Sequence, residues 1–232
     1  AQSRALEDAL TREALAYRIV GGVRFYERKE IKDALSFLKL LLNPDDDVSL
    51  RRIINVPARG IGKRVMEALE RVDLRPPTSD APLFAGAEPG SDESPPSLWA
   101  RLVRATDETL LPTRALTALS RFRELIENLT EVARNEAASV TLAKTLDQTG
   151  YIRALRDDGS EDAENRLANL MELVSAARDH EVREADTTLG GFVDRLSLLS
   201  EADEEQGAPD ARVWLMTLHA AKGLEFPMVV IA

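Results

Sequence analysis

The sequence contains no cysteine and only two histidines. Disulfides and thiolate metal sites are therefore excluded, and nothing in the composition demands an oxidising compartment. With so few of the usual metal ligands and nucleophiles, the composition also argues against metal or nucleophilic catalysis within the 232 residues.

Long apolar runs are also missing. No stretch approaches the roughly 18 apolar residues that a membrane-spanning helix needs. The N-terminus has no cationic segment followed by an apolar stretch, so no secretory signal is expected and a cytoplasmic location fits best. At 232 residues and 44% hydrophobic content, the chain can build a core for one large or two small domains.

Three catalytic templates fail as well. The phosphate-binding pattern GxxxxGK[ST] is absent: the only Gly-Lys pair, Gly62-Lys63, is followed by Arg64 and lacks the upstream glycine. The acidic stretch at 203–206 has the letters of the metal-binding box of ATPases. No apolar strand precedes it, however, which favours a solvated linker. His180 has no second histidine four residues on, so no zinc-binding helix is expected.

What the sequence does contain is mostly helical patterning. Apolar residues recur at helical spacing between residues typical of helix ends, such as Asp47 or Ser49 as a cap, Pro112 in a first turn and Gly150 at an end. The expected helices cover 3–15, 27–42, a short segment through Ile54, 63–72, 98–105, 112–134, 139–149, 161–180 and 188–200. Two stripes should face inward: Leu116, Leu119, Phe122, Ile126 and Leu129 in one helix, and Leu167, Leu170, Met171 and Val174 in another.

Strand-like runs bracket this helical body. They are YRIVGG at 17–22, VWLMTL at 213–218 and PMVVIA at 227–232. Between them, residues 73–97 hold six of the eleven prolines and predict a flexible surface loop. Residues 201–211 predict an acidic linker. The chain is therefore expected to be mainly α, with a few strands at its two ends.

The net charge of −10 argues against a partner such as nucleic acid, but the charge is unevenly spread. Residues 1–72 carry 14 basic and 11 acidic residues, whereas 73–232 carry 16 and 29. Residues 48–71 hold six basic residues against two acidic ones. Because salt screens charges beyond about 8 Å, such a patch can still hold phosphates, although charge alone favours a solvated helix face.

The stretch INVPARGIGKRVMEAL at 54–69 is the first candidate site. Pro57 ends one helix, Gly60 and Gly62 permit a tight turn, and the next helix begins beside Lys63 and Arg64. Free backbone amides, the helix dipole and mobile cations together can bind a phosphate. Such a site would bind the DNA backbone rather than a base sequence. The alternative is a plain turn between helices.

The stretch VWLMTLHAAKGLEFPMVVI at 213–231 is the second. A strand that runs into Thr217-Leu218-His219, followed by Lys222-Gly223-Leu224-Glu225, would project polar groups from its carboxyl end. Ligands of open α/β sheets bind there. A core strand with one satisfied histidine is the simpler alternative.

This second stretch resembles motif V of the superfamily-one DNA helicases of the UvrD/PcrA/Rep group. AQSRALEDAL, GGVRFYERKEIKD, the GIG stretch and SRFRELIENL resemble the same helicases in the same order. The resemblance covers the chain except the proline-rich loop, where the sequence departs from the usual pattern.

The resemblance implies a fold. In these helicases two RecA-like domains, 1A and 2A, bind ATP between them, and a helical domain, 2B, is inserted into 2A. By this resemblance, 1–20 and 211–232 would belong to 2A and 21–210 would be 2B. The phosphate loop, the metal-binding acidic box and the arginine motif of the family would lie outside these residues, so the chain alone should not hydrolyse ATP.

The resemblance also implies residue roles. Thr217 and His219 would contact single-stranded DNA, whereas Glu225 and Lys222 would lie at the nucleotide. The residues that match the duplex-gripping loop are Arg59, Gly60, Ile61, Gly62, Lys63 and Arg64. The 2B domain would swivel and restrain unwinding.

The parent would be an ATP-dependent 3′–5′ DNA helicase that uses ATP and Mg²⁺, with DNA and repair or replication proteins as partners. Two other interpretations stay open. One is a free-standing, non-enzymatic module that binds duplex DNA or has a regulatory role. The other is a motif V segment of a helicase-nuclease relative, against which the GGVRFYERKEIKD and GIG blocks argue.

Overall fold

A computed structural model of the protein describes residues 3–13, 15–20, 24–73, 96–184, 186–205 and 213–231. Most of the predicted loop at 73–97 and the glycines after the first strand lie outside these ranges. None of the helices within them is long and apolar enough to cross a membrane.

The described chain forms mainly helices. They are α1 (Ser3–Arg12), α2 (Lys29–Leu42), α3 (Asp47–Ile53), α4 (Lys63–Glu70), α5 (Leu98–Asp107), α6 (Thr113–Asn135), α7 (Ala138–Gln148), α8 (Tyr151–Asp158), α9 (Glu161–Arg183) and α10 (Leu189–Glu205), with a 3-10 turn η1 (Phe25–Glu27) before α2. Two short strands, β1 (Tyr17–Val20) and β2 (Val213–Met216), complete the fold. The mainly helical class expected from the sequence is confirmed.

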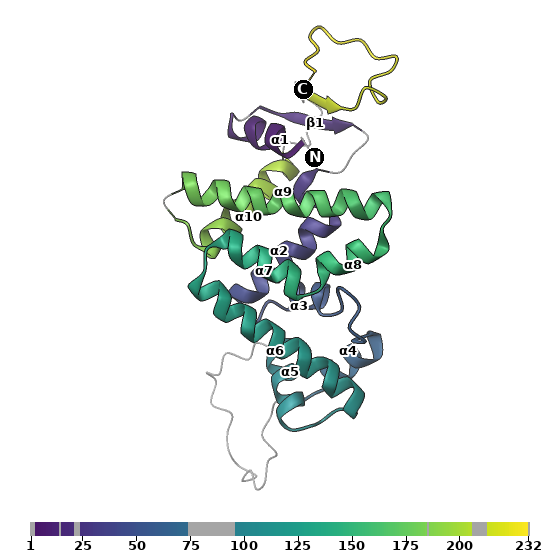
Figure 1. The fold of residues 1–232 in the computed structure, drawn as a ribbon, viewed down its shortest axis with the longest axis vertical. Helices are drawn as coiled ribbons and strands as arrows, with labels where there is room; N and C mark the ends of the chain where they lie inside the picture. The colour runs from purple at the N-terminus through teal and green to yellow at the C-terminus, as the bar shows by residue number, and fades with distance from the viewer. Residues whose placement is uncertain are drawn as a thin grey trace, which may run out of the picture.

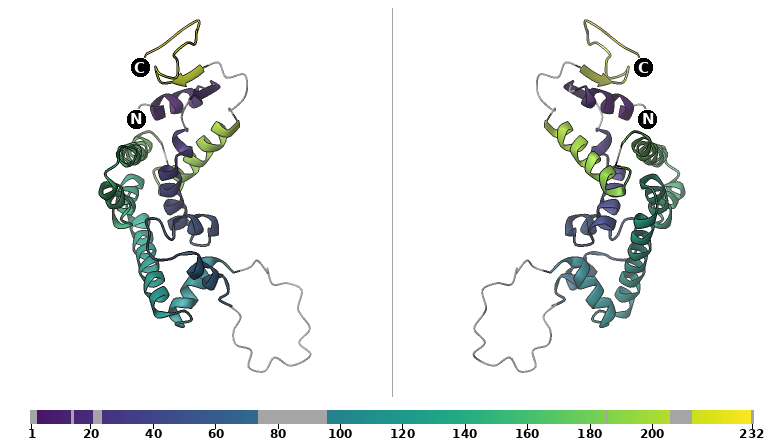
Figure 2. Two further views of the ribbon diagram at one scale, coloured as in Figure 1. Left: turned by 90° about the vertical axis from the view of Figure 1, so that its right-hand side faces the viewer. Right: turned by 90° about the vertical axis from the view of Figure 1, so that its left-hand side faces the viewer.

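Helix α2 is the central element of the helical body. Its buried residues include Ile31, Ala34, Phe37 and Leu38, and it packs against α3 and α10 on one side and α6, α7 and α9 on the other. Figure 2 shows the resulting two layers edge-on, with α6 descending past the end of α7 toward α4 and α5. Because α2 is apolar on several faces, both layers share one continuous core.

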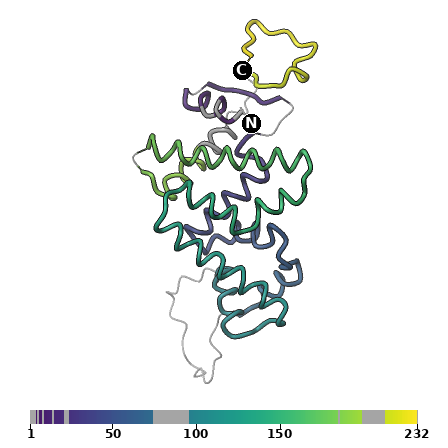
Figure 3. The backbone as a smooth tube through the Cα atoms, in the orientation of Figure 1, coloured from purple at the N-terminus to yellow at the C-terminus, as the bar shows by residue number. Residues whose placement is uncertain are grey.

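The two strands join segments that are nearly 200 residues apart. β1 pairs with β2 in parallel, with Tyr17 opposite Val213 and Val20 opposite Met216. The tube in Figure 3 shows the C-terminal segment returning beside the N-terminal one at the same end of the molecule. Arg4 of α1 links this end to the helical body, since its Nε lies 2.8 Å from Glu172 Oε1 on α9.

Several local predictions were wrong. Residues 151–158 form α8, which the pattern missed, and residues 201–205 belong to α10 rather than to a linker. The cap of α3 is Asp46, whose side chain accepts a hydrogen bond from Ser49 N, not Asp47 or Ser49. Met171 is exposed because the buried face of α9 includes Leu170, Leu173, Val174 and Ala177. Leu116 is only half-buried, and the described part of PMVVIA forms no strand.

Candidate functional site

The loop between α3 and α4 is fixed from inside by one amide side chain. Asn55 Oδ1 accepts hydrogen bonds from the backbone N–H groups of Arg59, at 2.7 Å, and Ile61, at 3.2 Å. The Ile61 side chain is 1% exposed and belongs to the hydrophobic core. The peptide bond between Val56 and Pro57 is cis. The hydrogen bonds to Asn55 and the burial of Ile61 hold the backbone of residues 55–62, hereafter called the GIG loop.

The two glycines of the GIG loop play different roles. Gly60 has a φ of +80°, a conformation that residues with a Cβ rarely adopt. Gly62 has a φ of −86° and a ψ of −177° and is the N-cap of α4. Among the described residues, no atom lies within 4 Å of the position that a Cβ would take at either glycine. Another molecule can therefore approach the backbone closely at either position.

The start of α4 is suited to an anion. Among the residues that the structure describes, no side chain caps this helix. Lys63 and Arg64 are exposed in its first turn, and Lys63 Nζ reaches only Glu67 Oε1, at 3.8 Å. The positive end of the helix dipole, the first amides and two mobile cations thus meet at one surface.

Ion pairs in the folded structure neutralise part of the excess positive charge of residues 48–71. Arg51 forms an ion pair with Glu70, and Arg52 Nε lies 2.7 Å from Asp33 Oδ1. Both positive charges are therefore partly neutralised. Lys63 and Arg64 are the exposed cations of this stretch that lie beside Gly62 at the start of α4.

Arg59 turns inward instead of toward solvent. Its Nη1 donates to the carbonyl oxygens of Ile53, Val56 and Pro57, and its Nη2 donates to Thr149 O at 2.9 Å. The guanidinium also lies over the rings of Phe37 and Phe122, 5.8 and 5.7 Å from their centroids. Burial lowers the pKa of Arg59 to about 10, so the side chain stays charged at neutral pH. The resemblance implies a DNA contact for Arg59, which stays a prediction, and the structure gives its side chain a bracing role.

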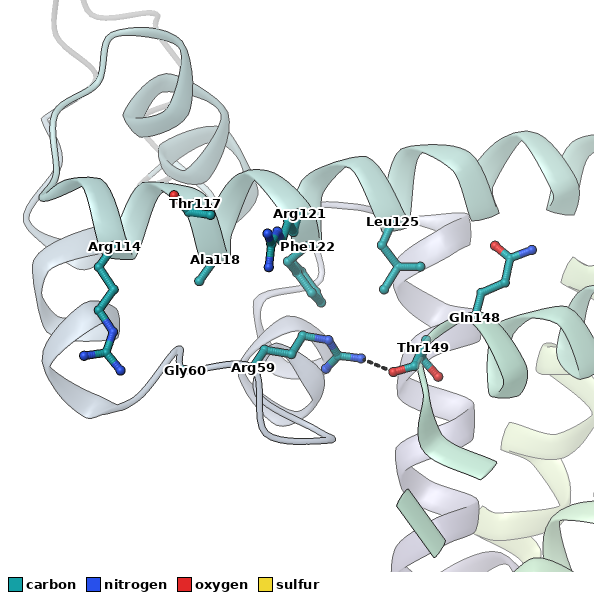
Figure 4. A pocket seen from close by; sticks show the side chains of 10 residues that line it. All are labelled: Arg59, Gly60, Arg114, Thr117, Ala118, Arg121, Phe122, Leu125, Gln148 and Thr149. Atoms are coloured by element: carbon teal, nitrogen blue, oxygen red, sulfur yellow. Dashed lines mark hydrogen bonds between the residues drawn. The ribbon is translucent and has the colours of Figure 1, made fainter. Parts of the chain in front are cut away.

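A groove opens beside the GIG loop, between the loop and α6, with a volume of about 640 Å³. Figure 4 shows Arg114 and Arg121 on one face of α6 and Gly60 and Arg59 opposite them. The lining is completed by Thr117, Ala118, Phe122, Leu125, Gln148 and Thr149. Arg114 and Arg121 were not among the candidate site residues indicated by the sequence. Their seven-residue spacing, which places both on one face of a helix, is the signal that could have found them.

The second candidate segment follows β2 directly. Thr217, His219, Lys222 and Glu225 are all exposed. Consecutive turns shape this segment, since Ala221 N donates to Thr217 O at 3.0 Å and Leu224 N donates to Ala221 O at 3.0 Å. The rings of Trp214 and Phe226, 5.6 Å apart and edge to face, bring its two ends together. All four polar side chains therefore lie on the single loop that follows the carboxyl end of β2.

The two segments lie at opposite ends of the molecule. Figure 1 places β1, β2 and the C-terminal segment at one end of the long axis and α4 and α5 toward the other. The structure therefore does not bring Thr217, His219, Lys222 and Glu225 together with the GIG loop.

A metal centre finds no support in the part of the chain that the structure describes. No group of three or more histidine, aspartate or glutamate side chains there could hold an ion. His180 is buried on α9, and its ring lies 5.5 Å from that of Phe192. It therefore packs in the core.

Comparison with known proteins identifies the family. The model of the UvrD-like helicase C-terminal domain matches residues 1–76 and 100–232. The chain is 38% identical over 235 residues to the ATP-dependent DNA helicase PcrA of Bacillus subtilis, covering 99% of this chain and 29% of that protein. It is 38% identical over 236 residues to DNA helicase II of Escherichia coli, covering 100% of this chain and 30% of that protein.

A third relative gives the same result. DNA helicase II of Haemophilus influenzae is 40% identical over 236 residues, covering 98% of this chain and 29% of that protein. The chain thus spans under a third of the length of these relatives. Since the family model matches nearly the whole sequence, the chain belongs to the UvrD-like helicase C-terminal domain family.

Proposed function

We propose that this chain is the duplex-contacting and DNA–nucleotide-coupling region of an ATP-dependent 3′–5′ DNA helicase. The relatives are named as DNA helicases: the Bacillus subtilis protein is named PcrA and the Escherichia coli protein is named DNA helicase II. In this proposal residues 21–210 are a 2B-type domain inserted into a RecA-like 2A domain, to which 1–20 and 211–232 belong. ATP and Mg²⁺ would be bound with parts of the parent that these residues do not include.

The GIG loop is the proposed duplex contact, and its geometry is the observation that supports the proposal most. Ile61 anchors the loop in the core, so Gly60 and Gly62 present their backbone in a fixed position. Lys63 and Arg64 stand exposed at the uncapped start of α4. Amides and cations that converge in this way hold phosphate oxygens and carry no base preference.

The segment after β2 is the proposed coupling element. Thr217 and His219 would contact single-stranded DNA, while Lys222 and Glu225 would face the nucleotide between 2A and the parent's other RecA-like domain. All four side chains are exposed and available for such contacts. Leu218, Met228 and Ile231 are also exposed, at 76%, 82% and 80%. We propose that further parts of the parent cover this apolar surface.

Binding of a short blunt DNA duplex to this chain, followed by fluorescence anisotropy, tests the duplex contact. Affinity should be low, with a dissociation constant weaker than roughly 10 μM at physiological salt, and should fall steeply as salt rises. Gly62→Val should fold, because the position has open space and an extended backbone. It should bind more weakly because the side chain blocks the approach of a phosphate.

Lys63→Ala should reduce the log–log salt slope by about one contact. Lys32→Ala, an exposed lysine on α2, is the matched control and should leave the slope unchanged. Equal binding by the wild type and Gly62→Val would reject the GIG loop as the duplex contact.

The coupling role is tested in the full-length parent. Glu225→Ala should remove most DNA-stimulated ATP hydrolysis, whereas this chain alone should hydrolyse no ATP. An unchanged turnover number and Michaelis constant would reject the assignment of Glu225. A GxxxxGK[ST] pattern elsewhere in the reading frame would distinguish a helicase from a free-standing DNA-binding module.

A further inference from the structure

We propose that the groove between the GIG loop and α6 is a second phosphate-binding site, in which Arg114 and Arg121 hold the backbone of the same DNA duplex. The inference rests on the proposed duplex contact at the GIG loop and extends it to a second element of the fold. Neither arginine belongs to the stretch that sequence reasoning assigned to DNA.

The chemistry of the groove is that of an anion site. Among the described residues that line it, three of ten are arginines and none is an aspartate or glutamate. In a chain of net charge −10, such a local absence of carboxylates is unexpected. Gly60 forms part of the lining, so the groove is continuous with the GIG loop. A strand held at the loop can therefore continue into the groove.

Arg114 and Arg121 differ from the other arginines of their helix. Arg123 Nη1 lies 2.6 Å from Asp107 Oδ1, and Arg134 Nη1 lies 2.6 Å from Glu131 Oε1. Within the described ranges Arg114 and Arg121 have no ion-pair partner, although both are exposed. The fold therefore neutralises the arginines that point elsewhere and leaves the two in the groove uncompensated.

Arg59 adds a fixed charge at the groove wall. Its donors are directed to backbone carbonyls and its faces to Phe37 and Phe122, and it forms no ion pair with a carboxylate of the described residues. The positive charge consequently acts on the groove without a direct contact to the ligand. The Thr117 hydroxyl donates to Thr113 O, which leaves Arg114 and Arg121 as the main free donors on α6.

The spacing of the two arginines suits an extended polyanion better than a single small one. Seven residues separate them, which corresponds to about 10 Å along a helix. Each guanidinium is a planar fork that can bind a phosphate through two parallel hydrogen bonds. Two such forks, carried about 10 Å apart along the helix, can each bind a separate phosphate of one polyanion.

The test is duplex binding by the Arg114→Ala/Arg121→Ala variant of the full 232-residue chain. Affinity should fall about tenfold or more at low salt, and the log–log salt slope should drop by about two contacts. Arg178→Ala on α9, another exposed arginine, serves as the charge control and should change the slope little. Arg114→Lys/Arg121→Lys should keep most of the salt slope while losing some affinity, because lysine keeps the charge but not the fork.

The outcomes separate this inference from the proposed function. If Gly62→Val weakens binding while the double alanine variant matches Arg178→Ala, the groove is rejected and the GIG loop contact stands. If the double alanine variant weakens binding and Gly62→Val does not, the groove binds DNA and the loop assignment fails. Absence of any duplex binding by the wild type at low salt would overturn both.

Discussion

The GIG loop is fixed by the protein core, whereas the segment after β2 lies largely in solvent. Ile61 is 1% exposed and both Asn55 and Arg59 hold the loop backbone from inside. After β2, the side chains from Thr217 to Ile231 are mostly exposed, and the ring of Phe226 contacts that of Trp214. Both segments carry polar residues to which the proposed function gives contacts, yet only the first is held by buried contacts within the described residues.

The two segments differ in how much ordering they require before they can bind a ligand. A preformed loop loses little conformational entropy when a phosphate docks, so it can bind DNA without further protein. An exposed segment with few buried contacts must first be ordered by a neighbouring surface. Under the proposed function, we therefore expect the GIG loop to bind within this chain and the segment after β2 to bind only together with further parts of a longer helicase.

The largest expected difference comes from removing one apolar side chain in each segment. Ile61→Ala should lower the free energy of unfolding by about 2–5 kcal/mol because it leaves a cavity in the core. Leu218→Ala removes a similar side chain that is 76% exposed and should change stability by no more than about 0.5 kcal/mol. Urea unfolding of both variants measures the contrast. Similar losses would mean that the two segments are equally well packed.

The next largest effect concerns Arg59 as an internal brace. Arg59→Met keeps much of the apolar stem but removes the donors to four carbonyl groups, including Val56 O and Thr149 O. A loss of about 2–3 kcal/mol is expected because buried carbonyls lose their partners. Arg64→Met, at an exposed position nearby, should be close to neutral. If Arg59→Met matched Arg64→Met in urea unfolding, the bracing role would be wrong.

A smaller effect distinguishes glycines by backbone conformation. Gly60→Ala should cost about 1–2 kcal/mol, since a φ of +80° is strained for a residue with a Cβ. Gly62→Ala should cost less than about 0.5 kcal/mol, because its φ of −86° suits alanine.

Gly223 has a φ of +85° but lies in the exposed segment. Local rearrangement there should relieve the strain, so the global unfolding midpoint of Gly223→Ala should not move. Thermal melts of the three variants measure the order, and a Gly223→Ala shift as large as that of Gly60→Ala would show that the second segment is rigid too.

Sequence patterning predicted the helices that have long apolar stripes. α2 and α6 were expected close to their observed bounds because their buried residues recur over several turns. α8 was missed because it is short and lies between Gly150 and Gly159, both at positive φ, and the first glycine alone suggested an end. In α9 the predicted buried face differs from the observed one. The buried alanines Ala176 and Ala177 contribute little to an apolar pattern, so the sequence did not indicate the face on which they lie.

The candidate site was predictable only in part. The glycines and cations at 60–64 are adjacent in sequence, so the pattern alone indicated a tight turn before a helix. The inward position of Arg59 depends on Phe37 and Phe122, which come from other helices. The groove exists only once α6 packs beside the loop, and no local pattern contains that information.

The smallest expected effect concerns Asp46, the cap of the helix from which the GIG loop emerges. Burial raises the pKa of Asp46, but hydrogen bonds from the Ser49 side chain and from the Ser49 and Val48 backbones, with the charge of Lys39, outweigh it and leave the pKa below its ordinary value of 3.8. A carboxyl group whose pKa is lower in the folded state stabilises the fold above its unfolded pKa. This contribution is lost as the pH falls through the folded pKa.

Asp46→Ala should therefore lower stability by about 1 kcal/mol at neutral pH, the usual effect of losing an N-cap. The difference from the wild type should shrink below pH 3.8, where the carboxylate of the wild type becomes protonated. Asp46→Asn keeps an acceptor for Ser49 N but carries no charge, so its stability relative to Asp46→Ala should not depend on pH. Urea unfolding at neutral and acidic pH measures all three proteins. A wild-type advantage over Asp46→Ala that stayed constant into acid would show that the charge of Asp46 does not support the helix that carries the loop.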